Sequence, residues 1–354
     1  MKILQMVDVP WDSGLSNYAL VLGQELQKKG HQVWVSTIAG QKPWAKAQRL
    51  GLPTVPLATW KSLPRLRQFL KEKQIDIVNA HTGATHSLAV MAALGQRTAV
   101  IRTRSDARAV RRSLGSTFLY KRTARVIAAA DYIRQDFMQA LDLTHDHVVT
   151  IYQGVDTTLY HPSPLPEPPI LGMVARLDPV KGHRYLLEAL ALLRPRDAVV
   201  RLKIIGQQEN TKQAELEALA GRLGVADAVE FLGFQADIPA LMRACTIGII
   251  ASTGSEAVSR VALEWMASGR PLVATRVGCL PEIVADRGEG ILVDPKNTTA
   301  LAEGLAKLLN DPAATALIAQ RARLRAESQF SLAAFADRTL TVYDQALTEF
   351  SRRL

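Results

Sequence analysis

The sequence predicts an α/β protein with two doubly wound parallel-sheet domains that face each other across a cleft. Short apolar runs alternate with helical patterns in the first half of the chain, and the same alternation starts again in the second half. A proline-rich segment separates the two halves. Because alternating strands and helices form parallel sheets with helices on both faces, each half is expected to form one such domain.

The first half, 1–160, is expected to form the N-terminal domain. Its first helical pattern begins at Ser16, which we expect to cap the helix, and ends at Gly30. Most of the apolar runs are separated by helical patterns, as the crossovers of a parallel sheet require. The runs expected to be strands are KILQMVDV, HQVWVSTIAG, PTVPLA, DIVNAH, TAVIRTR, RVIAAA and HVVTIYQ.

The segment YHPSPLPEPPI contains five prolines. Proline at this density favours an extended connector, so 161–169 is expected to link the domains. The C-terminal domain is expected to cover 170–330, followed by one long amphipathic helical pattern over 331–354. Its expected strands are ILGMVARL, VVRLKIIG, AVEFLG, TIGIIAST, PLVATR and GILVD.

Composition and missing motifs exclude several classes of protein. The chain has 354 residues, 48% of them hydrophobic and 21% charged, so it is not disordered and is long enough for two domains. No apolar run is long enough to span a bilayer, and the start lacks the apolar region of a signal peptide. Cys245 and Cys279 give neither a disulfide framework nor zinc spacing, which favours a reducing cytosol. Because no H-E-x-x-H, clustered His or Cys, or D-x-D occurs, we expect neither a metal nor a cofactor.

Positive charge is the unusual bulk property of this chain. The formal net charge is +10, and ten Lys or Arg fall between positions 97 and 134 against two acidic residues. This excess fits a nucleic acid, an acidic lipid surface, a phosphorylated sugar acceptor, or simply a solvated helix face. Bulky apolar residues interleave with the cations, as in a helix lying on an anionic membrane, and no nucleic-acid-binding module is recognisable. The cations expected to face a membrane or an acceptor are Arg102, Arg104, Arg108, Arg111, Arg112, Lys121 and Arg122.

A pair of glutamates follows one of the buried strands. Glu256 lies in the turn after the strand IGIIAST, and Glu264 lies about five residues into the next helix, which Gly269 closes. In open α/β sheets, ligands bind at the carboxyl ends of the strands. Carboxylates there are placed to accept hydrogen bonds from sugar or ribose hydroxyls, although solvated surface glutamates would show the same spacing.

Other polar residues also follow predicted strands. Arg176 ends a strand and Lys181 lies in the next loop or first helical turn, and this pair of cations fits a diphosphate site beside a helix N-terminus. Gly14 follows the first strand, where it either permits close approach to an anion or lies in an ordinary turn. His81 ends DIVNAH and is expected to point into the same crevice, whereas His86 lies inside the next helix and is interpreted as structural. Neither G-x-G-x-x-G, a P-loop nor G-x-S-x-G occurs.

Together these motifs resemble a retaining glycosyltransferase of family 4, which has the GT-B fold. The resemblance rests on the E-x7-E of Glu256 and Glu264, the R-x4-K of Arg176 and Lys181, and the segments DIVNAH and SGRPLVATRVGCLPEIV. IYQGVD and FSLAAFADRTLTVYDQAL follow in the family's usual order, so the resemblance covers essentially the whole chain.

The resemblance implies a nucleotide-binding role for several positions. Arg176 and Lys181 would hold the donor diphosphate, and Glu264 would bind the nucleotide ribose. Backbone near Gly206 and Phe234 would select the base. The helix over 331–354 would cross back and brace the N-terminal domain.

The resemblance also implies which residues meet the transferred sugar. Glu256 and His81 would act in catalysis, with Glu256 holding the sugar and His81 lying near the sugar and the acceptor. Gly14 would approach the diphosphate from the N-terminal domain. The next amides along the chain would help Glu256 hold the sugar, and they belong to Ala257, Val258 and Ser259. The sequence departs from the family pattern at Ser13, EAVS, Asn79 and Gln153.

The implied reaction moves a hexose-type sugar, with retention and without a metal, from a nucleotide diphosphate sugar to a lipid-linked or phosphorylated glycan such as a lipopolysaccharide core. The two domains would close over the donor, hinging near the proline-rich linker. We expect a cytoplasmic protein at the inner face of the cytoplasmic membrane. The alternatives are a sugar-nucleotide epimerase of the same fold and a non-enzymatic bilobed sugar-binding protein.

Overall fold

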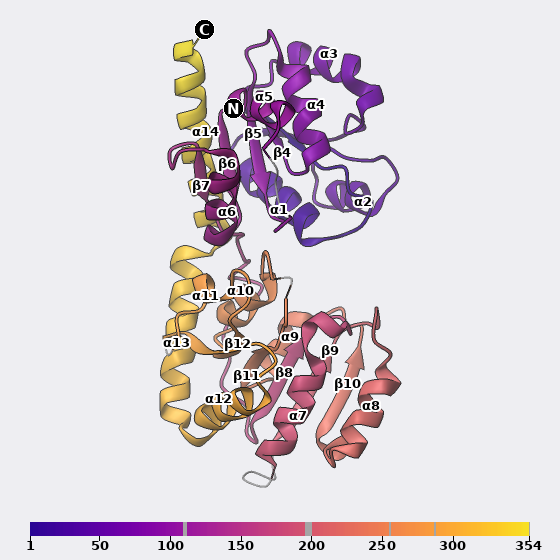
Figure 1. Cartoon of the computed structure of the whole chain (residues 1–354), viewed down its shortest axis with the longest axis vertical. Helices are drawn as coiled ribbons and strands as arrows, with labels where there is room; N and C mark the ends of the chain where they lie inside the picture. The colour runs from indigo at the N-terminus through magenta and orange to yellow at the C-terminus, as the bar shows by residue number, and fades with distance from the viewer. Residues whose placement is uncertain (109–111, 195–199, 255, 287, 354) are drawn as a thin grey trace. The chain divides into compact units, whose positions relative to one another are not determined.

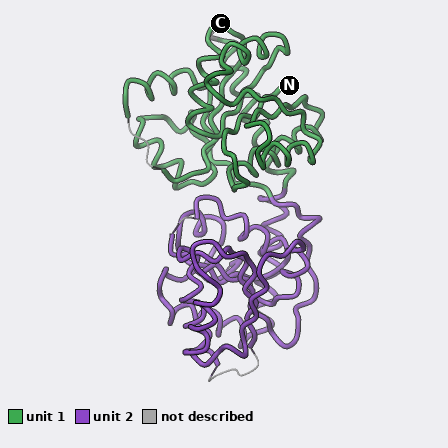
Figure 2. The backbone as a smooth tube through the Cα atoms, turned by 90° about the vertical axis from the view of Figure 1, so that its right-hand side faces the viewer, with its two compact units in different colours: residues 1–154, 332–354 green, residues 155–331 purple. Residues whose placement is uncertain are grey.

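The computed structural model describes residues 1–108, 112–194, 200–254, 256–286 and 288–353. The chain divides into two compact units, each of which is described by itself below. Unit 1 comprises Met1–Gly154 and Leu332–Leu354, and unit 2 comprises Val155–Ser331 (Figures 1 and 2). Each unit contains one parallel sheet with its own helices, which confirms the predicted class of two doubly wound α/β sheets.

Unit 1 contains a seven-stranded parallel sheet in the order β3-β2-β1-β4-β5-β6-β7. All seven runs predicted as strands pair in this sheet. The strand order changes direction between β1 and β4, so the carboxyl ends of these strands form a topological switch point. The strands are β1 (Lys2–Met6), β2 (Gln32–Ser36), β3 (Thr54–Val55), β4 (Ile77–Ala80), β5 (Ala99–Arg104), β6 (Arg125–Ala128) and β7 (Val148–Thr150).

The helices of unit 1 cover both faces of this sheet. Helix α3 packs with α4, and α1 packs with the C-terminal helix α14. A short 3₁₀ turn, Trp60–Ser62, precedes α3. The helices are α1 (Gly14–Lys28), α2 (Lys42–Arg49), α3 (Leu63–Lys73), α4 (Gly83–Ala93), α5 (Leu114–Lys121), α6 (Asp131–Leu141) and α14 (Leu332–Arg353).

The N-terminus of α1 corrects one sequence prediction. Ser13 caps the helix, and Ser16 is the third helical residue rather than the cap. The Ser13 hydroxyl accepts the Ser16 N–H at 3.2 Å, and the Ser16 hydroxyl accepts the Ser13 N–H at 2.9 Å. This reciprocal capping box satisfies two backbone donors, which is why the helix begins before Ser16.

Helix α14 packs on the face of the unit 1 sheet that carries two polar side chains, Gln5 and Asn79. Side chains alternate between the faces of a strand, so Gln5 and Asn79 point away from the apolar cluster that packs under α3 and α4. Both donate side-chain N–H groups to the Tyr343 hydroxyl of α14, at 3.2 and 2.8 Å. Phe335 of α14 packs edge-on against Tyr18 of α1, with ring centroids 4.8 Å apart. The last helix thus completes the unit formed by the first 154 residues.

Unit 2 contains a six-stranded parallel sheet in the order β10-β9-β8-β11-β12-β13, with its switch point between β8 and β11. All six predicted runs are strands. They are β8 (Ile170–Val174), β9 (Arg201–Ile205), β10 (Val229–Gly233), β11 (Ile247–Ile250), β12 (Leu272–Thr275) and β13 (Gly290–Val293). The helices are α7 (His183–Leu193), α8 (Gln213–Arg222), α9 (Ile238–Arg243), α10 (Arg260–Ala267), α11 (Leu280–Ile283), α12 (Thr298–Asn310) and α13 (Pro312–Gln329), with 3₁₀ turns at Pro179–Lys181 and Ala226–Ala228.

The proline-rich segment packs against unit 2. The buried Arg270 guanidinium donates to the Ser163 backbone oxygen at 2.9 Å, to the Ser163 hydroxyl at 2.6 Å and to the Pro164 oxygen at 3.3 Å. Gly269, at φ 63°, leaves room for Pro162, which would lie 2.9 Å from an added Cβ. These contacts hold residues 162–164 on the α10–β12 connection, so this segment is packed rather than free.

Candidate functional site

A tight loop places Lys181 at the carboxyl end of β8. The Asp178 carboxylate accepts the Val180 N–H at 3.0 Å and the Asn210 side-chain N–H at 2.7 Å, which closes the 3₁₀ turn that ends at Lys181. Gly182 follows at φ 76°, and a Cβ there would lie 2.0 Å from the Ala251 carbonyl oxygen. Glycine is therefore required, and it holds the loop against the end of β11.

The loop between β11 and α10 brings Glu256 to Lys181. The Lys181 Nζ atom lies 2.6 Å from Glu256 Oε1, and the Ser252 hydroxyl donates to the same oxygen at 2.6 Å. Glu256 is 4% exposed. Its own carbonyl accepts the Cys279 N–H at 2.9 Å, and a Cβ on Gly278 (φ 55°) would lie 2.1 Å from that carbonyl oxygen. Two loops that are distant in sequence thus meet at the switch point of the unit 2 sheet.

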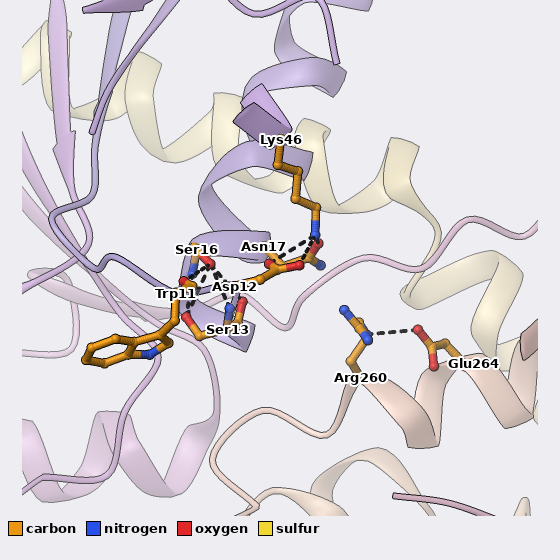
Figure 3. Close-up of polar contacts among 8 residues, drawn as sticks. All are labelled: Trp11, Asp12, Ser13, Ser16, Asn17, Lys46, Arg260 and Glu264. Atoms are coloured by element: carbon orange, nitrogen blue, oxygen red, sulfur yellow. Dashed lines mark hydrogen bonds and ion pairs between the residues drawn. The ribbon is translucent and has the colours of Figure 1, made fainter. Parts of the chain in front are cut away.

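Glu264 is the fifth residue of α10, as predicted, and it is buried. Its Oε1 atom lies 2.9 Å from Arg260 Nε, one turn earlier on the helix (Figure 3). The Tyr160 hydroxyl also hydrogen-bonds the carboxylate. Burial raises the pKa of Glu264, and the charge of Arg260 and the bond from Tyr160 oppose this rise. Two partners, Arg260 and Tyr160, therefore orient the Glu264 carboxylate.

Arg176 lies near Lys181 but is half exposed. Its guanidinium nitrogens lie 3.5 Å from Asp178 Oδ2 and 3.7 Å from Glu209 Oε1. Burial works to raise the pKa of Asp178, but hydrogen bonds from Val180 and Asn210 and the charges of Arg176 and Lys181 hold that pKa below its usual value. Asp178 is therefore an anion that both predicted phosphate-binding cations approach.

Residues expected near the base and the sugar lie in the same unit. A Cβ on Gly206 would lie 2.0 Å from the Ala175 carbonyl oxygen, so this glycine packs against the end of β8. Phe234, just after β10, is 76% exposed. The Ser259 amide, one of those expected to hold the sugar, instead donates to the Cys279 thiol at 3.3 Å, whereas Ala257 and Val258 are partly exposed.

In unit 1, the first loop after β1 forms a polar cluster. Gly14 is the first residue of α1, and a Cβ there would meet no atom within 4 Å. The Lys46 ammonium lies 3.0 Å from Asp12 Oδ2 and 2.9 Å from Asn17 Oδ1 (Figure 3). The open space beside Gly14 and the backbone N–H groups at the start of α1 would allow an anionic group to bind close to the backbone.

His81 follows β4 as predicted, but the expectation that it points into an open crevice is wrong. The side chain is completely buried, because the alternation along β4 places it on the face that α1 covers. Its Nε2 atom lies 2.7 Å from Gln5 Oε1, and its ring centroid lies 5.9 Å from that of Tyr18. Burial, with the charge of Arg102, lowers the pKa of His81 to about 3, so the ring is neutral. The Nδ1 atom has no hydrogen-bond partner in the described structure. His86, interpreted as structural, is buried and lies 2.7 Å from the Thr123 hydroxyl.

The basic segment does not form one membrane-lying helix, which corrects a third expectation. Arg102 and Arg104 belong to β5 and are buried. Arg102 donates to the Ala80 and Thr103 carbonyl oxygens, and the Arg104 guanidinium lies 5.0 Å from the Phe137 ring centroid. β5 pairs with β4 on one side and with β6 on the other, so its cations lie inside the unit. Arg111 lies outside the described residues, and the exposed cations of the predicted set are Arg108, Arg112, Lys121 and Arg122.

Sequence reasoning missed several residues that build this site. Gly182 and Gly278 stand inside motifs already singled out, VKGH and VGCLPEIV, so their spacing was a usable signal. Asp178 and Ser252 sit at strand ends, which is a weaker signal. Tyr160 gave none, because it borders a segment interpreted as linker. Within the described residues, no group of three or more His, Cys, Asp or Glu is placed to hold a metal ion.

Comparison with known families agrees with this geometry. The model described as "Glycosyl transferases group 1" matches residues 160–326, and the model described as "Glycosyltransferase Family 4" matches residues 13–159. The chain belongs to the family 4 glycosyltransferases. Both of the loops that meet at Lys181 and Glu256 lie inside the first of these matches, and the unit 1 loop with Gly14 lies inside the second.

Two curated bacterial proteins illustrate the relatives of this chain. An MMP α-(1→4)-mannosyltransferase of Mycolicibacterium hassiacum is 35% identical over 67% of the chain and 59% of its own length. A D-inositol 3-phosphate glycosyltransferase of Corynebacterium glutamicum is 32% identical over 60% of the chain and 55% of its own length. The matches thus span little more than half the length of these relatives.

Solved structures show that this chain has the GT-B fold. The crystal structure of Anabaena Alr3699/HepE in complex with UDP superposes with a TM-score of 0.86 at 25% identity. The superposition covers 97% of this chain and all of the Anabaena chain. The likeness therefore includes both Rossmann-like sheets and extends over nearly the whole of the chain.

Proposed function

We propose that this protein is a retaining, metal-independent glycosyltransferase that moves a hexose-type sugar from a nucleotide diphosphate sugar to an anionic glycan acceptor. The observation that carries the proposal is the meeting of Lys181 and Glu256 at the switch point of the unit 2 sheet. Open α/β sheets bind ligands at such a point. There a cation for the diphosphate stands beside a carboxylate for the sugar, with the Glu264 carboxylate on the adjoining helix for the ribose.

Lys181 and Arg176 act on the leaving group in this proposal. When the bond between the sugar C1 and the diphosphate oxygen breaks, negative charge builds on that oxygen, and a fixed ammonium and guanidinium stabilise it. The free N–H groups at the start of α7 add to this field. The acceptor oxygen forms the new bond to C1 on the same face, and its proton passes to the departing phosphate oxygen.

The other roles follow from what each side chain contacts. Glu264 is a buried acceptor with two orienting partners, which suits a ribose whose two hydroxyls both donate. Because His81 is completely buried and its Nε2 atom lies 2.7 Å from Gln5 Oε1, we assign to it the positioning of the strand ends of β1 and β4 rather than a contact to the sugar or the acceptor. A neutral His81 avoids placing a second positive charge beside the buried Arg102.

The donor can be identified by ligand binding followed by transfer. Screening UDP-, GDP- and ADP-sugars by thermal unfolding should reveal one nucleotide that raises the midpoint by about 5 °C at saturating concentration. The Anabaena neighbour was crystallised with UDP, which makes UDP-sugars the first to test. Transfer of labelled sugar to an anionic glycan must then require the acceptor. Turnover of the nucleotide sugar without any acceptor would instead favour an epimerase, and binding of free sugar without a nucleotide would favour a sugar-binding protein.

The acceptor side of the proposal depends on helix α5 of unit 1. Leu114, Phe118 and Arg122 lie four residues apart, and so they share one face of the chain through α5 and its end. Leu114 is 94% exposed and Phe118 39%, and the Arg122 guanidinium lies 3.9 Å from the Phe118 ring centroid. Apolar side chains flanked by cations suit an anionic lipid surface, and we propose that the acceptor is lipid-linked, as in a lipopolysaccharide core. No helix among the described residues is both long and apolar enough to cross a bilayer.

Removing this face should weaken binding to acidic vesicles. The variant with Leu114→Ser, Phe118→Ser, Lys121→Gln and Arg122→Gln is expected to bind phosphatidylglycerol vesicles at least tenfold more weakly at low salt, since each cation contributes about 1 kcal/mol near such a surface. The matched control is Lys71→Gln with Lys73→Gln, which removes the same number of exposed cations from α3. Vesicle co-sedimentation measures both. Equal loss in the control, or wild-type binding that salt does not change, would refute the role of α5.

A further inference from the structure

The contact between Lys181 and Glu256 joins two side chains that are assigned to different parts of the donor. Lys181 is assigned to the diphosphate and Glu256 to the transferred sugar, yet their charged atoms lie 2.6 Å apart. The Lys181 side chain is 20% exposed and that of Glu256 4%. A pair this close has no net charge, so Lys181 attracts a diphosphate fully only after Glu256 has left it.

Both partners are attached to firmly held backbone. Gly182, the neighbour of Lys181, packs on the Ala251 carbonyl, and the Glu256 carbonyl is held by the Cys279 amide against Gly278. The pair can therefore separate by rotation of its side chains while both loops keep their shape. The Ser252 hydroxyl is a second partner of the Glu256 carboxylate, and it donates to the same oxygen that Lys181 contacts.

We propose that, in the donor-free enzyme, Glu256 occupies the position at Lys181 that a donor phosphate takes. When the donor binds, its phosphate replaces Glu256 as the partner of Lys181. The inference rests on the proposed function. The diphosphate of the donor binds Lys181. The released Glu256 carboxylate accepts hydrogen bonds from the hydroxyls of the transferred sugar, and the Ser252 hydroxyl continues to donate to this carboxylate. Ser252 is thereby a positioning residue for Glu256.

The exchange discriminates between donor and product. A nucleoside diphosphate without its sugar would release Glu256 into a buried position where Ser252 is its one remaining side-chain partner among the described residues, and a buried carboxylate that has lost its cation is strongly unfavourable. The complete donor supplies a new partner for the Glu256 carboxylate through the hydroxyls of its sugar. After transfer, return of Glu256 to Lys181 favours departure of the nucleoside diphosphate.

Binding of diphosphates without a sugar tests this exchange directly. Calorimetry would measure the affinity of UDP, GDP, ADP and inorganic pyrophosphate for the wild type, Glu256→Gln, Lys181→Ala and the double variant. Glu256→Gln keeps the shape of the side chain and frees Lys181, so pyrophosphate and the preferred nucleotide should bind about tenfold more tightly, while sugar transfer falls. In the Lys181→Ala background the same substitution should change affinity less than twofold.

The double variant separates the exchange from a general electrostatic effect. If Glu256→Gln improves binding equally with and without Lys181, the carboxylate only repels the diphosphate from a distance, and the exchange is wrong. Unchanged or weaker binding in Glu256→Gln also overturns it. With either of these two outcomes, a lower diphosphate affinity in Lys181→Ala would still support the proposed function, although the exchange itself would be wrong. Thermal unfolding of each variant shows whether the fold is kept.

Ser252 offers a second measurement that involves no charge. Ser252→Ala should lower kcat with little change in the KM for the donor, because the carboxylate is then poorly placed for the sugar while Lys181 is untouched. Ser252→Thr retains the hydroxyl and should restore much of the rate. A Ser252→Ala enzyme with wild-type kcat would show that Ser252 does not position Glu256.

Discussion

Replacing Lys181 by alanine is expected to lower kcat/KM for sugar transfer by about 100- to 1000-fold, since removing one preorganised group that stabilises developing charge has effects of this size. Lys181 is fixed one residue before Gly182 and reaches the switch point of the unit 2 sheet, where the leaving diphosphate is proposed to lie. The other nearby cation, Arg176, is half exposed and already lies near Asp178 and Glu209, so it replaces Lys181 poorly. Steady-state transfer of labelled sugar measures the loss.

The control for Lys181→Ala is an exposed lysine of the same unit. Lys307→Ala, near the end of α12, should transfer sugar at the wild-type rate. The thermal midpoint of Lys181→Ala should fall clearly, because the buried Glu256 carboxylate then keeps only Ser252 as a side-chain partner among the described residues, and adding Glu256→Gln should restore it. Transfer by Lys181→Ala within a few-fold of wild type would remove the proposed site.

Replacing Glu264 is expected to act on nucleotide binding rather than on the sugar. Glu264→Ala should weaken binding of the nucleoside diphosphate by about tenfold to a hundredfold, because hydrogen bonds to a charged acceptor contribute about 1.5–3 kcal/mol. Glu264→Gln keeps the shape but replaces one acceptor by a donor, so it should lose a large part of the same affinity. Glu303→Gln on the exposed face of α12 is the matched control and should bind normally. Calorimetry with the preferred nucleotide measures all three.

The pKa of Glu264 predicts how this binding depends on pH. Burial raises that pKa, and only the ionised carboxylate accepts from both ribose hydroxyls. Affinity should therefore be complete above the raised pKa and fall as the pH drops through it, in a window above the ordinary glutamate value of about 4.3. Glu264→Gln should not show this fall in affinity. This comparison separates titration of Glu264 from titration of the nucleotide phosphate, which both proteins would share. Because the Tyr160 hydroxyl lowers this pKa, Tyr160→Phe should move the window to higher pH. An identical pH profile in wild type and Glu264→Gln would contradict the assignment.

The strands, and the positions of the cations and carboxylates that follow them, were predictable from sequence. Short apolar runs followed by polar residues identify buried strands and their carboxyl ends, which is where Arg176, Lys181 and Glu256 stand. Helical periodicity likewise placed Glu264 on α10. These are local properties, because a strand or a helix is recognisable from neighbouring residues alone.

The direction and burial of side chains were harder to predict. His81, Arg102 and Arg104 all stand at or near strand ends, and all were expected to face a ligand or a membrane. Whether such a side chain is exposed depends on which elements cover its face of the sheet. For His81 these include Tyr18 of α1, and α14, from the far end of the chain, covers the same face through Tyr343.

The sequence by itself thus determined the strands of the two parallel sheets and the charged residues that follow them, because each follows from short-range patterns of apolar and polar residues. Only the tertiary structure decided that Lys181 pairs with Glu256, that Tyr160 orients Glu264 and that two of the predicted surface arginines are interior. The two pairs join residues 75 or more positions apart, and the arginines are buried by neighbouring strands and helices, so both depend on how helix packing and strand order bring separate segments together.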